Sequence, residues 1–343
     1  MSLGTRQQVL LFFARVFLLA AHPVLTFQFV RNLKSLPNPA LPRRYHEKVL
    51  WRKIVDRNPI FVNLSDKLVA KQIAQARCPE LDVARVLWTG TDPRSLPTNL
   101  VASDVVVKAN HGSAANLFIA EGKPGYARIM TEAERWMAIS YHRLAGEWGY
   151  RNIPRRIFLE EKLVLGGGDL PTDIKVHAFG RRIGHVWVTD KPSGRSRTYG
   201  ADGTPLTARD LQYPREDLVA QAIELAARLL GGLVSDEHPP EETLPDTTAT
   251  RALVAQAIEL APRLLGGLDY ARVDFMVAGA RLYFGEYTLY PSGGYDRLGL
   301  AVTQRLEALW DLRNSYFLRA PHWGLARVYA EALRVALDQS DFI

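Results

Sequence analysis

Apolar and polar residues alternate along two neighbouring stretches in the last third of the chain, and this pattern predicts a β-hairpin. The strands are expected at Ala271–Val277 and Arg281–Tyr287, with a turn at Gly279. Each strand carries one carboxylate, Asp274 or Glu286, among apolar and aromatic neighbours. Burying an unpaired carboxylate costs several kcal/mol. The two carboxylates therefore either point to solvent or share a cation between them.

Apolar periodicity elsewhere predicts a mixture of helices and strands. Helices are expected at three segments: Asp66–Ala76, Thr131–Trp148 and Trp323–Leu337. Ser65 is the candidate N-cap of the first, and Thr131 with Glu134 forms a capping-box pattern in the second. Further strands are expected at Val105–Ala109, Arg156–Glu161, Thr172–Phe179 and Arg182–Asp190. Hairpins mixed with helices predict the α+β class.

The region from residue 9 to residue 30 is strongly apolar, so it requires a choice between a membrane span, a signal peptide and a surface helix. Arg15 would cost roughly 2.5–3.5 kcal/mol inside a span, and it also interrupts the apolar region that a signal peptide needs. Pro23 then ends the first helical segment. We expect an amphipathic first helix packed on the protein body, with a weak peripheral membrane contact as the alternative.

One helical stretch is duplicated. Leu218–Leu233 recurs as Leu253–Leu268, and the only difference is Pro262 in place of Ala227. Residues 234–250 between the copies hold five carboxylates, three prolines and no Lys or Arg, which is typical of a linker. We interpret 218–252 as an insert. The second copy leads directly into the predicted hairpin, but a helix-interior proline costs about 3 kcal/mol, so we expect that copy to kink or stop near Ala261. The pattern leaves open which copy packs on the core.

Composition narrows the class of protein. The 343 residues are 47% hydrophobic and 23% charged, as in folded proteins with two or three subdomains. The net charge of +7 favours anionic partners, but the basic residues are spread along the whole chain and no zinc-finger spacing occurs, so we expect no nucleic-acid binding. The single cysteine, Cys78, excludes an internal disulfide and fits a cytoplasmic protein.

A lysine at the end of an apolar strand is the first candidate for anion binding. Lys108 is followed by a small polar turn that contains His111, Gly112 and Ser113. Its charge can meet a phosphate while the turn adds backbone N–H groups, so these three residues are candidates as well. The alternative is a strand-end lysine that extends into water.

Other charged residues extend this candidate site. Glu160 and Glu161 end a predicted strand and can bond an adenine amino group or ribose hydroxyls. Lys175 alternates with apolar residues and can face the same cleft. Arg272 shares a strand face with Asp274 and can stabilise a phosphoryl or tetrahedral species.

Lys67 follows Asp66 at a predicted helix start, where an ordinary solvated ion pair is the alternative to a ligand contact. If a cation joins the two hairpin carboxylates, Mg²⁺ held together with ATP phosphates is the simplest candidate. No nucleophile elbow, Walker loop or His-Glu-x-x-His motif is present, so those chemistries have no support.

Together these residues resemble the ATP-grasp enzymes, and more closely the TupA-like group linked to teichuronopeptide and surface-polysaccharide synthesis. The similar stretches follow one order over residues 23–300: Tyr45–Lys53, Asp56–Pro59, Ser65–Lys67, Val106–Ser113, Glu147–Tyr150, Ile157–Glu161, Asp173–Lys175, Arg272–Phe275 and Phe284–Thr288. The resemblance implies an ATP-grasp fold, in which two α+β lobes hold ATP between them, here with an extra duplicated helix and an acidic linker. It also implies ATP-dependent carboxylate–amine ligation through an acylphosphate.

The resemblance also implies roles for single residues, with ATP and Mg²⁺ as cofactors. Lys67 and Lys108 would contact the phosphates, and Glu160 or Glu161 would bind the nucleoside. Lys175 would line the ATP cleft. Mg²⁺ would be held by Asp274 and Glu286, and Arg272 would face the transferred phosphoryl group. Many ATP-grasp enzymes have asparagine two residues after the metal-binding glutamate; Thr288 stands there and is a candidate ligand. Lys71, where arginine is usual, and Ala114-Ala115 in the glycine loop are departures.

The expected organisation has four parts: an N-terminal helical region (1–100), a small ATP-grasp lobe (101–165), a large lobe with the metal-binding hairpin (166–300) and a C-terminal helical segment (301–343). The expected substrates are a small-molecule, glycan or peptide carboxylate and an amine. Three alternatives stay open: an ATP-grasp kinase, a polysaccharide-biosynthesis glycosyltransferase, and a degenerate nucleotide-binding partner protein.

Overall fold

The computed structural model describes residues 4–101, 103–120, 123–164, 172–207, 244–296 and 298–340. The first copy of the duplicated helix, Leu218–Leu233, and the acidic linker up to residue 243 lie outside the described residues. The insert prediction therefore stays untested on that side.

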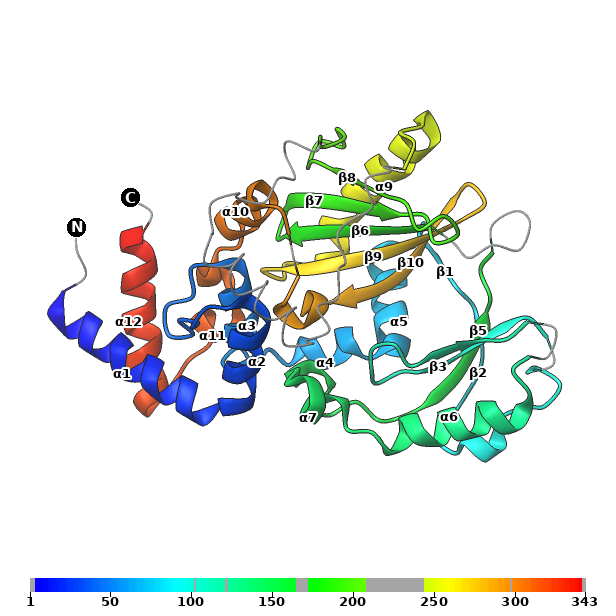
Figure 1. The fold of residues 1–343 in the computed structure, drawn as a ribbon, viewed down its shortest axis with the longest axis horizontal. Helices are drawn as coiled ribbons and strands as arrows, with labels where there is room; N and C mark the ends of the chain where they lie inside the picture. The colour runs from blue at the N-terminus through cyan, green and yellow to red at the C-terminus, as the bar shows by residue number, and fades with distance from the viewer. Residues whose placement is uncertain are drawn as a thin grey trace, which may run out of the picture.

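A six-stranded sheet forms the larger half of the molecule (Figure 1). Its strand order is β1 (Asp82–Val83), β10 (Arg281–Thr288), β9 (Ala271–Ala278), β6 (Thr172–Phe179), β7 (Arg182–Thr189) and β8 (Ser196–Tyr199). Neighbours are antiparallel except β1 and β10, which run parallel. Helix α9 (Thr248–Leu265) packs on β6, β7 and β9 beside α5 (Lys67–Arg77), and this layer contains most of the main core.

A four-stranded antiparallel sheet forms the smaller half, at the lower right of Figure 1. Its order is β2 (Val86–Gly90), β5 (Ile157–Glu161), β3 (Val105–Ala109) and β4 (Asn116–Phe118). Helix α6 (Tyr126–Ala138) covers it and buries Ile129, Ala133 and Trp136 against the strands. Two sheets, each with its own helical layer, confirm the α+β class.

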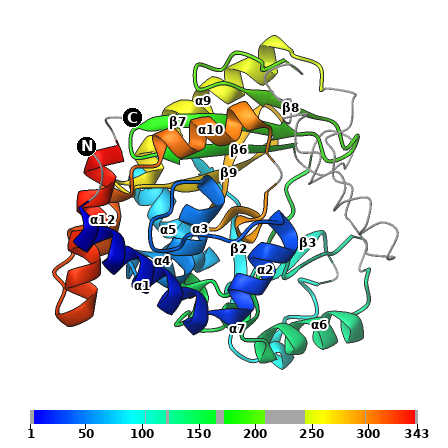
Figure 2. The same cartoon turned by 60° about the vertical axis from the view of Figure 1, so that its left-hand side comes forward.

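The remaining helices lie outside the two sheets, and the first and last of them lie side by side (Figures 1 and 2). They are α1 (Thr5–Ala21), α2 (Pro23–Leu33), α3 (Tyr45–Ile54), α4 (Ile60–Ser65), α7 (Tyr141–Ala145), α10 (Leu300–Leu309), α11 (Tyr316–Arg319) and α12 (Gly324–Ser340). Short 3₁₀ turns lie at Pro93–Ser95, Trp148–Tyr150, Pro291–Gly294 and Leu312–Asn314. Helix α1 packs along α12, so the first and last described helices stabilise each other.

Two strand predictions, those at Val105–Ala109 and Thr172–Phe179, agree with the structure at both ends, and the other strands differ only at their ends, as is usual for element boundaries. The predicted cap of the Asp66–Ala76 helix is wrong. Ser65 ends α4, and the Asp66 carboxylate accepts a hydrogen bond from the backbone N–H of Leu68 at 3.0 Å. Aspartate is at least as good an N-cap as serine, so either residue fitted the pattern.

The single helix predicted at Thr131–Trp148 is wrong, because α6 begins at Tyr126 and ends at Ala138. Thr131 lies inside α6, where its hydroxyl donates to the Ala127 carbonyl at 3.1 Å instead of capping a terminus. The backbone becomes extended at Ile139, and α7 then ends at Gly146, which has a positive φ of 67°. Apolar periodicity continues across this break and conceals it.

The predicted stop near Ala261 is also wrong, because α9 continues through Pro262 to Leu265 and ends at Gly266 in a left-handed conformation. Pro262 has no N–H group, so the helical hydrogen bond to the Ile258 carbonyl is lost. The buried face of α9 offsets the loss with Val254, Ala257, Leu260, Ala261, Leu264 and Leu265. The second copy of the duplicated stretch thus packs on the core.

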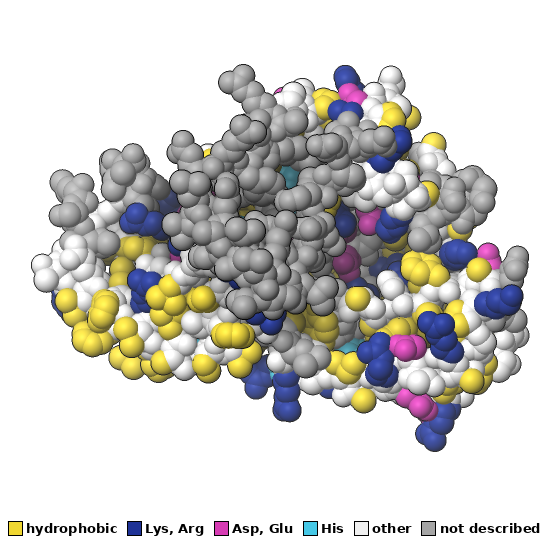
Figure 3. Space-filling view, viewed as in Figure 1, with side chains coloured by type: hydrophobic (Ala, Val, Ile, Leu, Met, Phe, Trp, Pro, Cys, Tyr) yellow, Lys and Arg dark blue, Asp and Glu magenta, His cyan; other side chains and the backbone are white. Residues whose placement is uncertain are grey.

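The N-terminal helix ends before Pro23 and packs on the body of the protein, as predicted. Within the described residues, none of the single helices is long and apolar enough to cross a membrane; only α1 and α2 taken together reach that length, and they are bent by 95°. Apolar side chains nevertheless gather on the outside of these two helices, at the lower left of Figure 3.

Candidate active site

A cleft opens between the two sheets and receives charged side chains from both. The cavity has a volume of about 220 Å³. Its charged lining comes from α5 (Lys67, Lys71), β3 (Lys108), β5 (Glu160, Glu161), the ends of β6 and β7 (Asp173, Lys191) and the hairpin (Asp274, Glu286). The structure therefore brings together six of the residues predicted from sequence: Lys67, Lys108, Glu160, Glu161, Asp274 and Glu286.

A β-bulge places the two hairpin carboxylates on the same face. Phe284 pairs with Phe275, but the next pair is Glu286 with Asp274, so Gly285 is an extra residue in β10. In a regular strand Glu286 would share the face of Phe284, which is fully buried in the core. The bulge shifts the alternation by one residue and directs Glu286 into the cleft beside Asp274.

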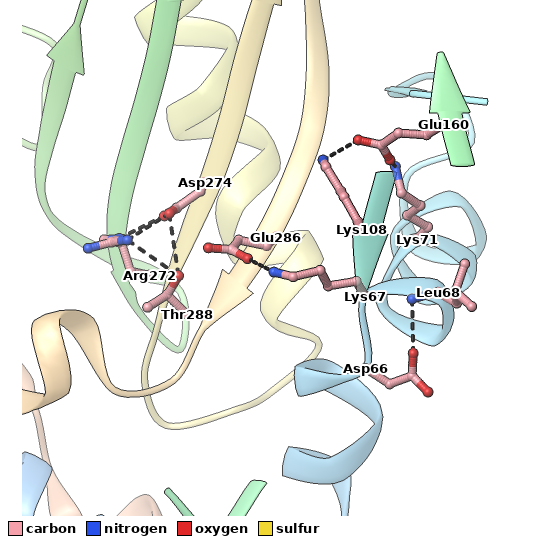
Figure 4. Close-up of polar contacts among 10 residues, drawn as sticks. All are labelled: Asp66, Lys67, Leu68, Lys71, Lys108, Glu160, Arg272, Asp274, Glu286 and Thr288. Carbon is pink, nitrogen blue, oxygen red and sulfur yellow. Dashed lines mark hydrogen bonds and ion pairs between the residues drawn. The ribbon is translucent and has the colours of Figure 1, made fainter. Parts of the chain in front are cut away.

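Asp274 is held by two neighbours on the hairpin (Figure 4). Arg272 donates from Nε and Nη2 to the two carboxylate oxygens, both at 2.7 Å. The hydroxyl of Thr288 donates to Oδ2 at 3.3 Å. Burial opposes the charge on Arg272, but Asp274 outweighs it and raises the pKa of the guanidinium above its ordinary value. Arg272, Asp274 and Thr288 thus form one connected group. Of the three, Asp274 lines the cavity, whereas Arg272 and Thr288 lie behind it and outside the lining.

Glu286 is paired with Lys67, which arrives from the first turn of α5 (Figure 4). The Lys67 Nζ lies 2.5 Å from Glu286 Oε2. Desolvation alone would raise the pKa of Glu286, but the charge and hydrogen bond of Lys67, with Arg272 nearby, lower it to about 2. A cation at a helix N-terminus is unfavourable for the helix dipole, so Lys67 is stabilised there by anions. Its side-chain position is therefore one that an anionic ligand would also stabilise.

Glu160 lies on the opposite wall and is only 2% exposed. It accepts a hydrogen bond from Lys108 and forms an ion pair with Lys71, whose Nζ lies 3.0 Å from Glu160 Oε2. Burial opposes ionisation, but the two lysines outweigh it and hold the pKa of Glu160 below its usual range. Glu160 therefore stays charged and positions both lysines at the cavity wall.

The donor set fits Mg²⁺ bound together with phosphate. Asp274, Glu286 and Thr288 offer hard oxygen ligands from adjacent strands, the type that Mg²⁺ prefers. In the described part of the chain no group of three or more His, Cys, Asp or Glu side chains could hold a metal ion alone. Mg²⁺ commonly takes one or two carboxylates and completes its shell with substrate phosphates and water. The two hairpin carboxylates can supply the protein ligands of such an ion, and the nearby lysines can bind the phosphates that supply the others.

Other predicted residues lie at the margin. Lys175 pairs in register with Asp274 across β6 and β9, and its Nζ lies 3.8 Å from Asp173, a lining residue. Glu161 lines the cavity and accepts from the backbone N–H of Arg85 at 2.8 Å.

The turn after β3 contributes differently from the prediction. Both ring nitrogens of buried His111 are occupied, one by Asn110 Oδ1 at 3.1 Å and the other by the Trp136 carbonyl at 3.0 Å. The cavity lining includes residues 114–116 and not His111, Gly112 or Ser113. The structure thus does not place these three residues in the lining of the cleft.

Two lining cations, Lys71 and Lys191, are absent from the residues predicted as site members. Lys71 stands four residues after Lys67 in a predicted helix, so its position on the same face is a signal that the sequence contains. Lys191 follows β7 and pairs with Asp173 at 2.7 Å. No local pattern marks it.

Replacing Gly285 by alanine is expected to disrupt the bulge. A Cβ at this position would lie 2.7 Å from the Asp274 carbonyl oxygen, closer than real contacts allow. We expect a loss of about 1–3 kcal/mol in the free energy of unfolding, together with impaired ligand binding because Glu286 moves. Denaturant unfolding and nucleotide titration check this. Gly279→Ala is the control, because it strains the turn of the same hairpin and leaves the strand at Gly285 unchanged. If Gly285→Ala were as stable as the wild type, the role of the bulge would be contradicted.

Glu147, a buried carboxyl close to the cleft, makes the free energy of unfolding depend on pH. Burial raises its pKa to about 7 from the ordinary 4.5, Lys53 at 4.0 Å lowers it, and Glu286 raises it again. Between pH 4.5 and about 7 the folded protein holds a proton that the unfolded chain has released, so this group lowers the free energy of unfolding as pH rises.

Replacing Glu147 by glutamine should remove that dependence. The stability of Glu147→Gln relative to the wild type is expected to rise by up to about 3 kcal/mol between pH 4 and pH 8. Denaturant unfolding across this range measures it. For Glu331→Gln, which changes an exposed carboxylate on α12, the difference in the free energy of unfolding from the wild type should stay constant with pH. A difference that also stays constant with pH for Glu147→Gln would contradict the raised pKa of Glu147.

Comparisons with known proteins bear on the same part of the chain. Residues 246–301 match the family model described as TupA-like ATP-grasp. The match spans α9, β9, β10 and the 3₁₀ turn that follows. None of the curated proteins matches the chain.

Among solved structures the chain is similar to several ATP-grasp ligases. The ligase PsnB complexed with a minimal precursor is 13% identical, with a TM-score of 0.37 over 74% of this chain and 62% of that one. A RiPP-associated ligase of Chryseobacterium gregarium, in complex with ADP and a leader and core peptide, is 13% identical, with a TM-score of 0.37 over 78% and 64%.

The D-alanine–D-alanine ligase of Helicobacter pylori is 14% identical, with a TM-score of 0.43 over 77% of this chain and 66% of that one. The chain thus spans less than two thirds of the length of each of these three proteins. Over residues 246–301 the family model confirms the expected resemblance to the TupA-like ATP-grasp family, and this stretch includes the hairpin that presents Asp274 and Glu286 to the cleft.

Proposed function

We propose that this protein is an ATP- and Mg²⁺-dependent ligase that joins a carboxylate to an amine through an acylphosphate. The observation that carries the proposal is the cleft itself. It sets lysines from α5 and β3 against two hairpin carboxylates. The hairpin itself lies in the segment that matches an ATP-grasp family model. Phosphoryl transfer needs positioning and neutralisation of charge, which this set of side chains can supply.

Each proposed phosphate-binding lysine is held by a carboxylate before ligand arrives. Lys108 and Lys71 are held by Glu160, and Lys67 by Glu286. Lys67 can exchange Glu286 for a phosphate oxygen, which frees that carboxylate. Asp274, Glu286 and Thr288 would then hold Mg²⁺, which neutralises phosphate charge when bound. Arg272 keeps Asp274 oriented through two hydrogen bonds and faces the transferred group.

The proposed reaction has two balanced steps. A carboxylate oxygen of the substrate attacks the γ-phosphorus of ATP, and the bond from that phosphorus to the β–γ bridging oxygen breaks, which leaves an acylphosphate and ADP. The nitrogen of a neutral amine then attacks the acyl carbon, the C–O bond to phosphate breaks, and the nitrogen releases a proton to water. The protein needs no covalent nucleophile, because binding, orientation and charge stabilisation suffice.

The TupA-like resemblance supports a substrate class. We infer that the carboxylate belongs to an acidic sugar or peptide of a surface polymer and that the amine belongs to an amino acid or similar compound, joined in the cytoplasm. Lys175 and Lys191, at the edge of the cleft beside Asp173, are available to an acidic substrate group.

A product assay separates this proposal from its alternatives. The protein is incubated with Mg·ATP, amino acids and uronic acids or acidic peptides, and ADP, free phosphate and amide are measured. A ligase gives all three in equal amounts, whereas a kinase gives ADP and a phosphorylated hydroxyl without free phosphate. Turnover of a nucleotide sugar without ATP would indicate a glycosyltransferase. ATP binding without products from any pair would favour a nucleotide-binding partner protein, and Glu286→Gln is the inactive control.

A further inference from the structure

Helix α1 carries a row of exposed apolar side chains. Val9, Phe12, Phe13, Val16 and Phe17 are all exposed, the three phenylalanines by 61%, 65% and 69%. Their spacing of three and four residues places them on one side of the helix, along the outside of the protein.

The inner side of α1 is apolar as well. Leu11 is buried against Ala332 and Ala336 of α12, with Leu10 beside them. A surface helix normally has a polar outer face, and a helix that is apolar all round is normally buried. Helix α1 therefore packs inward on α12 and α2, and its outer apolar face has no partner among the described residues.

Helix α2 extends the apolar face around the bend. Val24 and Phe27 are each 65% exposed, whereas Leu25 and Phe29 turn inward and are buried. The axes of α1 and α2 differ by 95°. Figure 3 shows apolar side chains gathered over both helices at the lower left of the molecule. We call the exposed residues Val9, Phe12, Phe13, Val16, Phe17, Val24 and Phe27 the apolar face.

The charged residues of α1, α2 and the segment that follows them have one sign. Residues 4–46 contain six Lys or Arg residues and no Asp or Glu. Arg6, Arg31 and Lys34 are exposed on α1 and α2 or directly after them. Bulky aromatic residues bordered by cations match a surface that is apolar inside and anionic outside. A symmetric contact between two copies would instead bring like charges together, which opposes association.

We propose that α1 and α2 bind the surface of an anionic lipid bilayer. Both helices lie in the interface, the apolar face enters the acyl boundary, and Arg6, Arg31 and Lys34 meet the lipid phosphates. Neither helix crosses the membrane. This inference does not depend on the chemistry proposed for the cleft.

Vesicle sedimentation tests the proposal with the whole protein. Binding to vesicles of phosphatidylcholine with 30% phosphatidylglycerol is compared with binding to pure phosphatidylcholine at low and high salt. We expect about tenfold or tighter binding to the anionic vesicles, weakened by salt. The Phe13→Glu/Phe17→Glu variant should lose at least about tenfold of this binding, because two charges replace exposed aromatic rings.

Two controls keep the result specific. Leu300→Glu changes an exposed apolar residue on α10 and should bind vesicles like the wild type. Arg31→Gln/Lys34→Gln should lose the preference for anionic lipid and keep the fold, judged by its unfolding curve. Equal binding by the wild type and the Phe13→Glu/Phe17→Glu variant overturns the proposal. Absence of wild-type binding to both kinds of vesicle also overturns the proposal. This includes the case in which the wild type forms a dimer and the Phe13→Glu/Phe17→Glu variant is a monomer.

Discussion

Replacing Lys108 by methionine is expected to lower ATP turnover by about 100- to 1000-fold while the protein stays folded. That is the usual effect of removing one charged donor that faces a reacting group. The fold should persist because Glu160, the buried partner of Lys108, keeps a second cation in Lys71 at 3.0 Å. Methionine also retains most of the apolar stem that lies against the strand.

Steady-state ADP release and a denaturant curve measure the two parts of this result. Arg135→Met removes an exposed cation from α6 of the same lobe and should leave both unchanged, because exposed ion pairs contribute little. Glu286→Gln should match Lys108→Met in turnover and also weaken Mg²⁺ dependence. Wild-type turnover in either variant would overturn the site assignment.

The largest expected loss of stability comes from Arg52→Met. Arg52 is fully buried, and its guanidinium donates to both oxygens of Asp269 and to the Tyr270 carbonyl, each at 2.7 Å. Removing the cation leaves Asp269 buried with a hydrogen bond from the Trp310 indole at 2.9 Å but without its ion-pair partner. Breaking a buried pair in this way typically costs about 3–5 kcal/mol.

Asp56 should add to that loss. Burial and the nearby Asp269 raise the pKa of Asp56 to about 7, and Arg52 is the main group that opposes the shift. Without Arg52 the carboxyl should stay protonated to higher pH, so Arg52→Met should be least stable relative to wild type in alkaline solution.

Denaturant unfolding of Arg52→Met, Asp269→Asn and the double variant measures the coupling between the two residues. The exposed pair of Arg263 and Glu80 offers the control, since Arg263→Met should leave the free energy of unfolding almost unchanged. A loss below about 1 kcal/mol for Arg52→Met would show that the buried pair is dispensable.

Local patterns were sufficient for the strands. Val105–Ala109 and Thr172–Phe179 are buried on one or both faces, and their alternation ends where polar turns begin, so sequence alone placed them correctly. The hairpin was equally visible. These elements also carry Lys108, Asp274 and Glu286, and for that reason the charged lining of the cleft could be predicted in part.

The errors arose where tertiary contacts decide between local alternatives. Asp66 and Ser65 both suit a helix start, and the choice depends on how α4 meets α5. Pro262 disfavours a helix locally, yet burial of α9 on the sheet outweighs it. His111 looks available in the sequence, but hydrogen bonds to the Trp136 carbonyl and to Asn110 occupy both of its ring nitrogens. The spacing of the apolar residues changes by one position between Phe284 and Tyr287 because of the bulge at Gly285. A strand pattern alone does not show which residue is the extra one.

Helix α5 sets a distance across the cleft. Lys67 contacts a carboxylate of the larger sheet and Lys71 contacts one of the smaller sheet. The two lysines lie four positions apart in a regular helix, which corresponds to an axial rise of about 6 Å. The spacing between the two walls is thus fixed by the pitch of a rigid element instead of by loop length. An inserted residue between these lysines would rotate one of them by about 100° and remove one wall from reach.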